Sequence, residues 1–137
     1  MKPSVIIDSG PLVALINARD ANHAWTVGEL KKVAGPVLTC EAVISEAIFL
    51  LRRLAGGTGQ IVGMLRTEGL RVAFCLDSEM SRVCDLLTKY ADIPISLADA
   101  SLVRMSELYP RHLLMTFDSE FSVYRRNRRQ RIPLITL

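Results

Sequence analysis

The sequence of 137 residues has little of what identifies several common kinds of site. It has two histidines and three cysteines, and no C-x-x-C pair, so we expect reduced thiols and no zinc site. No Ser–His–Asp or Cys–His arrangement stands out, which argues against a side-chain nucleophile. No G-x-G-x-x-G motif follows the first apolar segment, and this absence argues against a dinucleotide site.

Long hydrophobic runs are also missing. No apolar run approaches the roughly 18 residues that a membrane span needs. The opening stretch, "MKPSVIIDSG", does not have the pattern of a signal peptide. We therefore expect a cytoplasmic protein with no membrane association.

The composition is that of one globular domain over residues 1–137. Half of the residues are hydrophobic and 23% are charged, which argues against disorder. The net charge of +3 is unevenly placed, because "YRRNRRQR" (124–131) holds five arginines and no acid. This stretch suits contact with nucleic acid phosphates and equally suits a solvated turn.

Short apolar segments alternate with helical patterns along the chain. This alternation predicts an α/β fold with a mainly parallel sheet covered on both faces. The predicted strands are 4–8, 37–40, 70–77, 112–118 and 132–137. The predicted helices are 11–18, 21–34, 41–55, 59–69, 78–91, 96–109 and 119–127. A glycine-rich turn is expected at 55–60, and a serine cap at Ser78.

Two aspartates stand where predicted strands end. Asp8 follows the first strand and Asp118 a late one, and in parallel sheets ligands bind at the carboxyl ends of strands. If these strands are neighbours, both carboxylates project from one edge. Each aspartate also suits a helix cap. Thr116 lies two residues before Asp118 and would share its face.

Two further acids lie on predicted helices. Asp99 completes an S-x-x-D pattern with Ser96, a relative of the capping box that explains an acid there without a ligand role. Glu46 falls on the apolar side of its helix at 3.6 residues per turn. A carboxylate set into an apolar face is unfavourable unless it meets a cation or strong hydrogen-bond donors, and Arg53 and a bound metal are the two candidate partners.

Taken together, Asp8, Glu46, Asp99 and Asp118 predict a metal site. Clustered carboxylates repel one another unless a divalent ion lies among them. Ligands that are all oxygen favour Mg²⁺ or Mn²⁺. Carboxylate-bound Mg²⁺ in turn suits phosphate chemistry. Whether one ion or two would bind stays open.

Four pieces of the sequence resemble PIN domains, and most of all the VapC-type ribonuclease toxins of toxin–antitoxin pairs. They are "VIIDSGPLVALI", "EAVISEAIFLL", "YADIPISLADASLV" and "HLLMTFDSEF", and they occur in family order. The resemblance implies a three-layer α/β/α sandwich and an endoribonuclease that depends on Mg²⁺ or Mn²⁺. Its catalytic and metal-binding acids would be Asp8, Glu46, Asp99 and Asp118, supported by Ser9 and Thr116. The implied products are a 5′-phosphate and a 3′-hydroxyl.

The resemblance also implies partners. RNA would be the substrate, an antitoxin protein would block the site, and the chain would form a homodimer. The alternative is a PIN-fold module that binds RNA or protein without cutting it. Phosphotransferases of the dehalogenase and receiver types are disfavoured, because the first strand ends in "DSG" rather than D-x-D and "VLTC" (37–40) supplies no acceptor aspartate.

Overall fold

A parallel sheet forms the centre of the computed structural model, which describes residues 2–137. Its strand order is β3-β2-β1-β4-β7, and every neighbouring pair is parallel. The strands are β1 (Val5–Ile7), β2 (Val37–Thr39), β3 (Leu70–Val72), β4 (Leu113–Met115) and β7 (Leu134–Ile135). Because β1 and β4 are neighbours, the residues that follow them lie at the same edge, as predicted.

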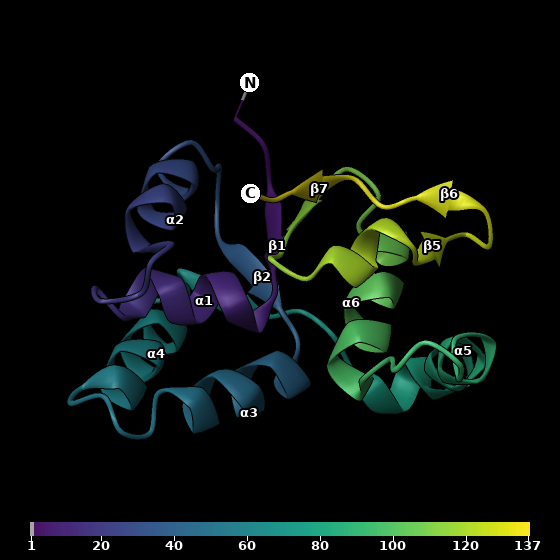
Figure 1. Cartoon of the computed structure of the whole chain (residues 1–137), viewed down its shortest axis with the longest axis horizontal. Helices are drawn as coiled ribbons and strands as arrows, with labels where there is room; N and C mark the ends of the chain where they lie inside the picture. The colour runs from purple at the N-terminus through teal and green to yellow at the C-terminus, as the bar shows by residue number, and fades with distance from the viewer. Residues whose placement is uncertain (1) are drawn as a thin grey trace.

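Helices flank the sheet on both sides. They are α1 (Ser9–Ile16), α2 (His23–Leu30), α3 (Glu41–Leu50), α4 (Gly57–Arg66), α5 (Leu76–Lys89) and α6 (Leu97–Leu108). In Figure 1, α1, α2 and α4 lie to one side of β1, and α5 and α6 lie to the other. The predicted α/β/α class with a parallel sheet is therefore confirmed. No helix within residues 2–137 is long and apolar enough to cross a membrane.

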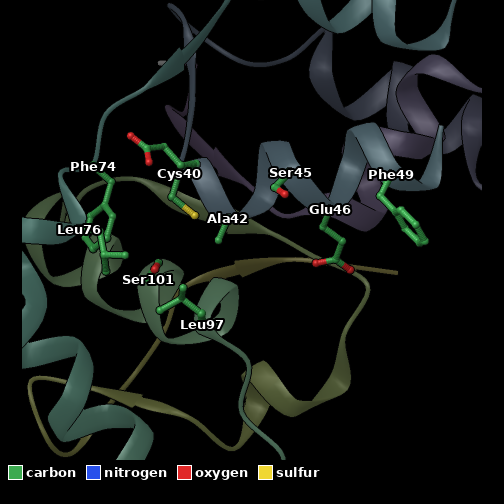
Figure 2. A pocket seen from close by; sticks show the side chains of 10 residues that line it. Cys40, Ala42, Ser45, Glu46, Phe49, Phe74, Leu76, Leu97 and Ser101 are labelled. Atoms are coloured by element: carbon green, nitrogen blue, oxygen red, sulfur yellow. The ribbon is translucent and has the colours of Figure 1, made fainter. Parts of the chain in front are cut away.

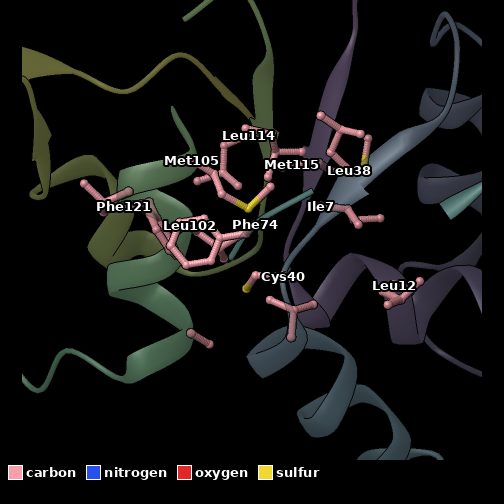
Figure 3. Close-up of a cluster of buried hydrophobic side chains, with 14 of the residues drawn as sticks. Ile7, Leu12, Leu38, Cys40, Phe74, Leu102, Met105, Leu114, Met115 and Phe121 are labelled. Carbon is pink, nitrogen blue, oxygen red and sulfur yellow. The ribbon is translucent and has the colours of Figure 1, made fainter. Parts of the chain in front are cut away.

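The core fills the space between the sheet and its helices. All three residues of β1 are buried, which explains why this strand reads as a continuous apolar run. Figure 3 shows Leu102 and Met105 of α6 beside Leu114 and Met115 of β4. These four side chains are fully buried, so α6 is fixed against the centre of the sheet.

Several predicted boundaries were wrong. Helix α1 begins at Ser9 rather than residue 11, because the Asp8 carboxylate accepts a hydrogen bond from the Ser9 N–H. Helix α5 begins at Leu76 with Cys75 at its N-cap, so the predicted strand 70–77 ends early and Ser78 is not a cap. Helix α4 already begins at Gly57, where a Cβ would lie 3.0 Å from the Leu51 carbonyl oxygen.

The predicted helix 119–127 was also wrong. A short 3-10 helix, η1 (Ser119–Ser122), is followed by an antiparallel hairpin of β5 (Arg125–Arg126) and β6 (Gln130–Arg131). The turn between them places Asn127 at φ 47° and Arg128 at φ 72°. A helix cannot continue through such left-handed residues.

Two leucines of α6 test this account of the core. Leu102 is fully buried, whereas Leu108 is 39% exposed. We expect Leu102→Ala to lower the free energy of unfolding by about 2–5 kcal/mol, because it leaves a cavity against the sheet. Leu108→Ala should cost less than about 1 kcal/mol. Urea denaturation measures both, and equal losses would contradict the packing described.

Candidate active site

The four predicted acids line one cavity at the carboxyl-end edge of β1 and β4. The cavity has a volume of about 360 Å³. Its lining residues are Asp8, Ser9, Gly10, Glu46, Ser96, Asp99, Phe117 and Asp118. The acids come from segments far apart in the sequence, and the parallel sheet with α3 and α6 brings them together.

Asp8 is the most buried of the four. Its side chain caps α1 by accepting a hydrogen bond from the Ser9 N–H at 2.7 Å. The other carboxylate oxygen accepts from the Thr116 hydroxyl, also at 2.7 Å. The cap and the place in the cavity are therefore compatible, and Thr116 holds Asp8 from the neighbouring strand end.

Asp118 shares Thr116 with Asp8. The Thr116 hydroxyl oxygen accepts a hydrogen bond from the Asp118 N–H at 3.0 Å. The Asp118 side chain is exposed and caps η1 by accepting from the Glu120 N–H at 2.9 Å. One of its oxygens therefore has a local role, and the residue as a whole lies at the mouth of the cavity.

Asp99 forms the capping box that the sequence predicted. The Asp99 N–H donates to the Ser96 hydroxyl oxygen at 3.0 Å, and the Ser96 N–H donates to Asp99 Oδ2 at 3.1 Å. The residue nevertheless lines the cavity and is half-buried. Capping and facing the cavity are thus both satisfied by one side chain.

The prediction for Glu46 was correct in its direction, toward the other acids, and wrong in its burial. Glu46 faces the cavity with the other acids, but it is exposed rather than set into the core. The reason is that α3 extends beyond the sheet, and its neighbours Phe49 and Leu50 are 59% and 51% exposed. Within the described residues, neither Arg53 nor another basic side chain forms an ion pair with Glu46.

The electrostatics of the cavity favour a cation. The pKa of Asp8 is raised to about 6, chiefly by burial and also by the nearby carboxylates of Asp99 and Glu46, while the hydrogen bonds from Thr116 and Ser9 act to lower it. Burial likewise raises the pKa of Asp99, with the charges of Asp118 and Glu46 adding to the effect. None of the described residues that line the cavity carries a positive charge.

The donor set fits a hard divalent ion, because it consists of carboxylate oxygens. The side chains are not already gathered around one point. Among residues 2–137, no three His, Cys, Asp or Glu side chains lie close enough together to hold an ion as they stand. Binding therefore requires the exposed carboxylates of Glu46 and Asp118 to turn inward toward Asp8.

One further residue lies near the acids without any signal in the sequence. Tyr124 follows η1 and is fully buried, and its hydroxyl has no hydrogen-bond partner among the described residues. Burial raises the pKa of Tyr124, and the charges of Asp99, Asp118 and Glu120 raise it further. The residue therefore lies within the field of the acids, six positions after Asp118.

An apolar groove adjoins the acidic cavity. Figure 2 shows it between α3 and α6, with Phe74, Leu76 and Leu97 around Cys40 and Ser101. Its volume is about 620 Å³, and Glu46 lines both the groove and the acidic cavity. A chain lying in the groove would therefore reach the acids.

Comparison with known proteins identifies the family. Residues 5–127 match the family model of the PIN domain, and because this is most of the chain, the chain belongs to that family. Ribonuclease VapC26 of Mycobacterium tuberculosis is 26% identical over 116 residues, which are 83% of this chain and 86% of that protein.

The fold also matches a solved structure. The crystal structure of Mycobacterium tuberculosis VapC20, described as a Sarcin-Ricin loop cleaving toxin, aligns with a TM-score of 0.77 at 21% identity. The alignment covers 88% of this chain and 94% of that one. The family expected from the four sequence pieces is therefore confirmed.

Burial of Asp8 predicts a pH-dependent stability. Its pKa of about 6 exceeds the unfolded value of 3.8, so the folded state binds more protons between these values and loses stability as pH rises through them. The shift is worth about 3 kcal/mol at neutral pH. With EDTA present, Asp8→Asn removes this cost but loses one of the two accepted hydrogen bonds, which is worth about 1 kcal/mol. We therefore expect its free energy of unfolding at pH 7 to rise by about 2 kcal/mol.

Urea denaturation of both proteins across pH 3.5–7.5 measures this difference. The gain should disappear at about pH 4.5 and become a loss of about 1 kcal/mol at lower pH, where the wild-type carboxyl is protonated in both states and the lost hydrogen bond remains. A difference between the proteins that does not change with pH would contradict the burial of a charged Asp8.

Thr116 offers a second test, with Thr39 as its control. Both are fully buried, but the Thr39 hydroxyl donates to the Ile7 carbonyl at 2.9 Å and bonds no acid. We expect Thr116→Val to weaken Mn²⁺ binding about 10-fold, since it frees the Asp8 carboxylate. Thr39→Val should leave that affinity within about 2-fold. Calorimetric titration with Mn²⁺ measures both, and equal effects would refute the positioning role.

Proposed function

We propose that this protein is a metal-dependent endoribonuclease and the toxin of a toxin–antitoxin pair. The observation that carries the proposal is the convergence of four carboxylates, with no basic residue, on one cavity of a PIN fold. The relative named as a ribonuclease and the fold shared with a toxin structure support it.

Each acid has a distinct place in the proposed site. Asp8 would be the central ligand, because it is buried and held from two sides. Asp99 and Asp118 would use the carboxylate oxygen that is not engaged in capping. Glu46 would close the site from the solvent side, and Ser9 and Thr116 would support Asp8.

The proposed reaction is hydrolysis of an RNA phosphodiester bond. Asp8, Glu46, Asp99 and Asp118 would hold Mg²⁺ or Mn²⁺, which would supply an activated water and neutralise charge on the phosphoryl oxygens. One of the four carboxylates would accept the proton of the attacking water, and the departing 3′ oxygen would take a proton from solvent. In-line attack with loss of the 3′ oxygen would leave a 5′-phosphate and a 3′-hydroxyl.

The proposed protein partners match two surfaces. The apolar groove beside the cavity suits a segment of an antitoxin, which would reach the acids past Glu46. Exposed apolar residues on α3 and α4, Leu50 and Val62, suit the contact of a homodimer.

Cleavage by the purified chain tests the function. With Mg²⁺ or Mn²⁺ we expect RNA to be cut, and Asp8→Asn or Asp99→Asn should reduce the rate by about 100-fold or more. Asp77→Asn is the matched control, because Asp77 is exposed on α5 and outside the cavity. EDTA should abolish the activity.

Two outcomes would contradict the proposal. Cleavage that persists in EDTA would exclude a metal-dependent reaction. Tight RNA binding without cleavage of several RNAs, with either metal, would favour the binding module instead.

A further inference from the structure

The arginine-rich segment 124–131 forms a hairpin whose arginines divide into two groups. Arg125 and Arg126 are half-buried and bond to backbone carbonyls. Arg128, Arg129 and Arg131 are exposed and form no ion pair within residues 2–137. The first group builds the hairpin, and the second group is left for a partner.

The hairpin is firmly attached to α6 and α5. The Arg126 guanidinium donates to the carbonyls of Ser106 and Pro110 at 3.0 and 3.2 Å. The Asn127 N–H donates to the Glu107 carboxylate. Lys89 of α5 donates to the Arg128 carbonyl at 3.0 Å. The exposed arginines therefore stand on a fixed platform, which lowers the entropy lost when they bind.

The buried acid beside the hairpin does not neutralise these arginines. Glu107 has a side chain only 3% exposed and is already paired with Arg82 and Arg104 at 2.7 and 3.2 Å. A polar hollow of about 700 Å³ lies between the hairpin, α5 and α6. Its basic lining residues are Arg82, Lys89, Arg104 and Arg128, against the two acids Asp85 and Glu107.

The chemistry of the surface favours a nucleic acid over a protein partner. Residues 127–131 are all polar and all exposed, so the hairpin offers no apolar anchor of the kind that protein interfaces need. Guanidinium groups bind phosphates through paired hydrogen bonds, and RNA backbones bind through such contacts. Arg128 also occupies the left-handed region at φ 72°, which favours glycine.

The hairpin is within reach of a chain held at the acids. Asp99 lies in the first turn of α6 and Glu107 in its last, a separation of about 12 Å along the helix axis. Figure 1 shows the β5–β6 hairpin beside the C-terminal end of α6, on the side of the molecule away from α4.

We infer that Arg128, Arg129 and Arg131 form a second contact for the RNA, gripping backbone phosphates a short distance along the strand from the cut. This inference rests on the proposed function. It assigns the hairpin to substrate binding and not to the chemical step. Removing the three arginines should therefore lower the affinity for RNA and leave the arrangement of the acids unchanged.

Binding of RNA to an inactive protein tests the inference. The background is Asp8→Asn in EDTA, and the probe is a fluorescein-labelled single-stranded RNA about 20 nucleotides long. On this background, changing Arg128, Arg129 and Arg131 to Ala should raise the Kd about 10-fold at about 0.1 M salt. The slope of log Kd against log salt should fall by about 2, as expected for three lost phosphate contacts on a single strand.

The matched control changes Arg53, Arg66 and Arg71 to Ala. These arginines are exposed, form no ion pair among the described residues, and belong to the α3–α4 side and to the opposite sheet edge, β3. The net charge falls equally, but the Kd should change less than about 3-fold. If the hairpin variant unfolds, Arg129→Ala with Arg131→Ala leaves the turn intact and should lower the slope by about 1.

Equal effects of the two triple variants would overturn the inference, because general charge would then explain binding. Unchanged RNA affinity in the hairpin variant would also overturn it and would leave an acidic protein as the occupant. Failure of the proposed function is distinct: the wild type would then cut no RNA, whether or not the hairpin binds it. Cutting without a hairpin effect would refute this inference alone.

Discussion

The hydrogen bond between the Thr116 hydroxyl and the Asp8 carboxylate ties the site to the fold. It joins the ends of two neighbouring parallel strands, β1 and β4, at 2.7 Å in a buried position. The same hydroxyl oxygen accepts the N–H of Asp118, and the Asp8 side chain caps α1. One small polar contact therefore links the ends of two paired strands, the cap of a helix and two of the four acids. Its burial is also what makes a charged Asp8 unfavourable in the absence of a cation.

The surrounding residues leave this charge uncompensated. A structural carboxylate in a core is normally paired with arginine or lysine, as Glu107 is with Arg82 and Arg104 elsewhere in this chain. Asp8 instead faces Asp99 and Glu46, which raise its pKa. The contrast between the two carboxylates is that Glu107 is neutralised by arginines and Asp8 is not. A divalent ion bound as proposed would relieve the repulsion among the acids.

The sequence was sufficient to locate residues that follow strand ends. It was less informative about features that depend on how the elements pack together. Asp8 and Asp118 could be located because buried strands end abruptly in an acid, and the capping pattern of Ser96 and Asp99 is local. The exposure of Glu46 could not be predicted, since a helical wheel does not show how far α3 extends beyond the sheet. The hairpin was missed because Arg128 takes a left-handed conformation without glycine. Tyr124 had no local signature, because its place near the acids arises from the turn after η1.

The central claim is that the four carboxylates together form one binding site for divalent metal. A crystal structure of the protein soaked in Mn²⁺, with anomalous scattering to locate the metal, tests it most directly. The account predicts a manganese peak between Asp8, Glu46, Asp99 and Asp118. Glu46 would be turned inward from its position in Figure 2, and Asp118 inward from the mouth of the cavity. A fully Mn²⁺-saturated crystal with no peak in this cavity, or with the ion bound elsewhere, would contradict it.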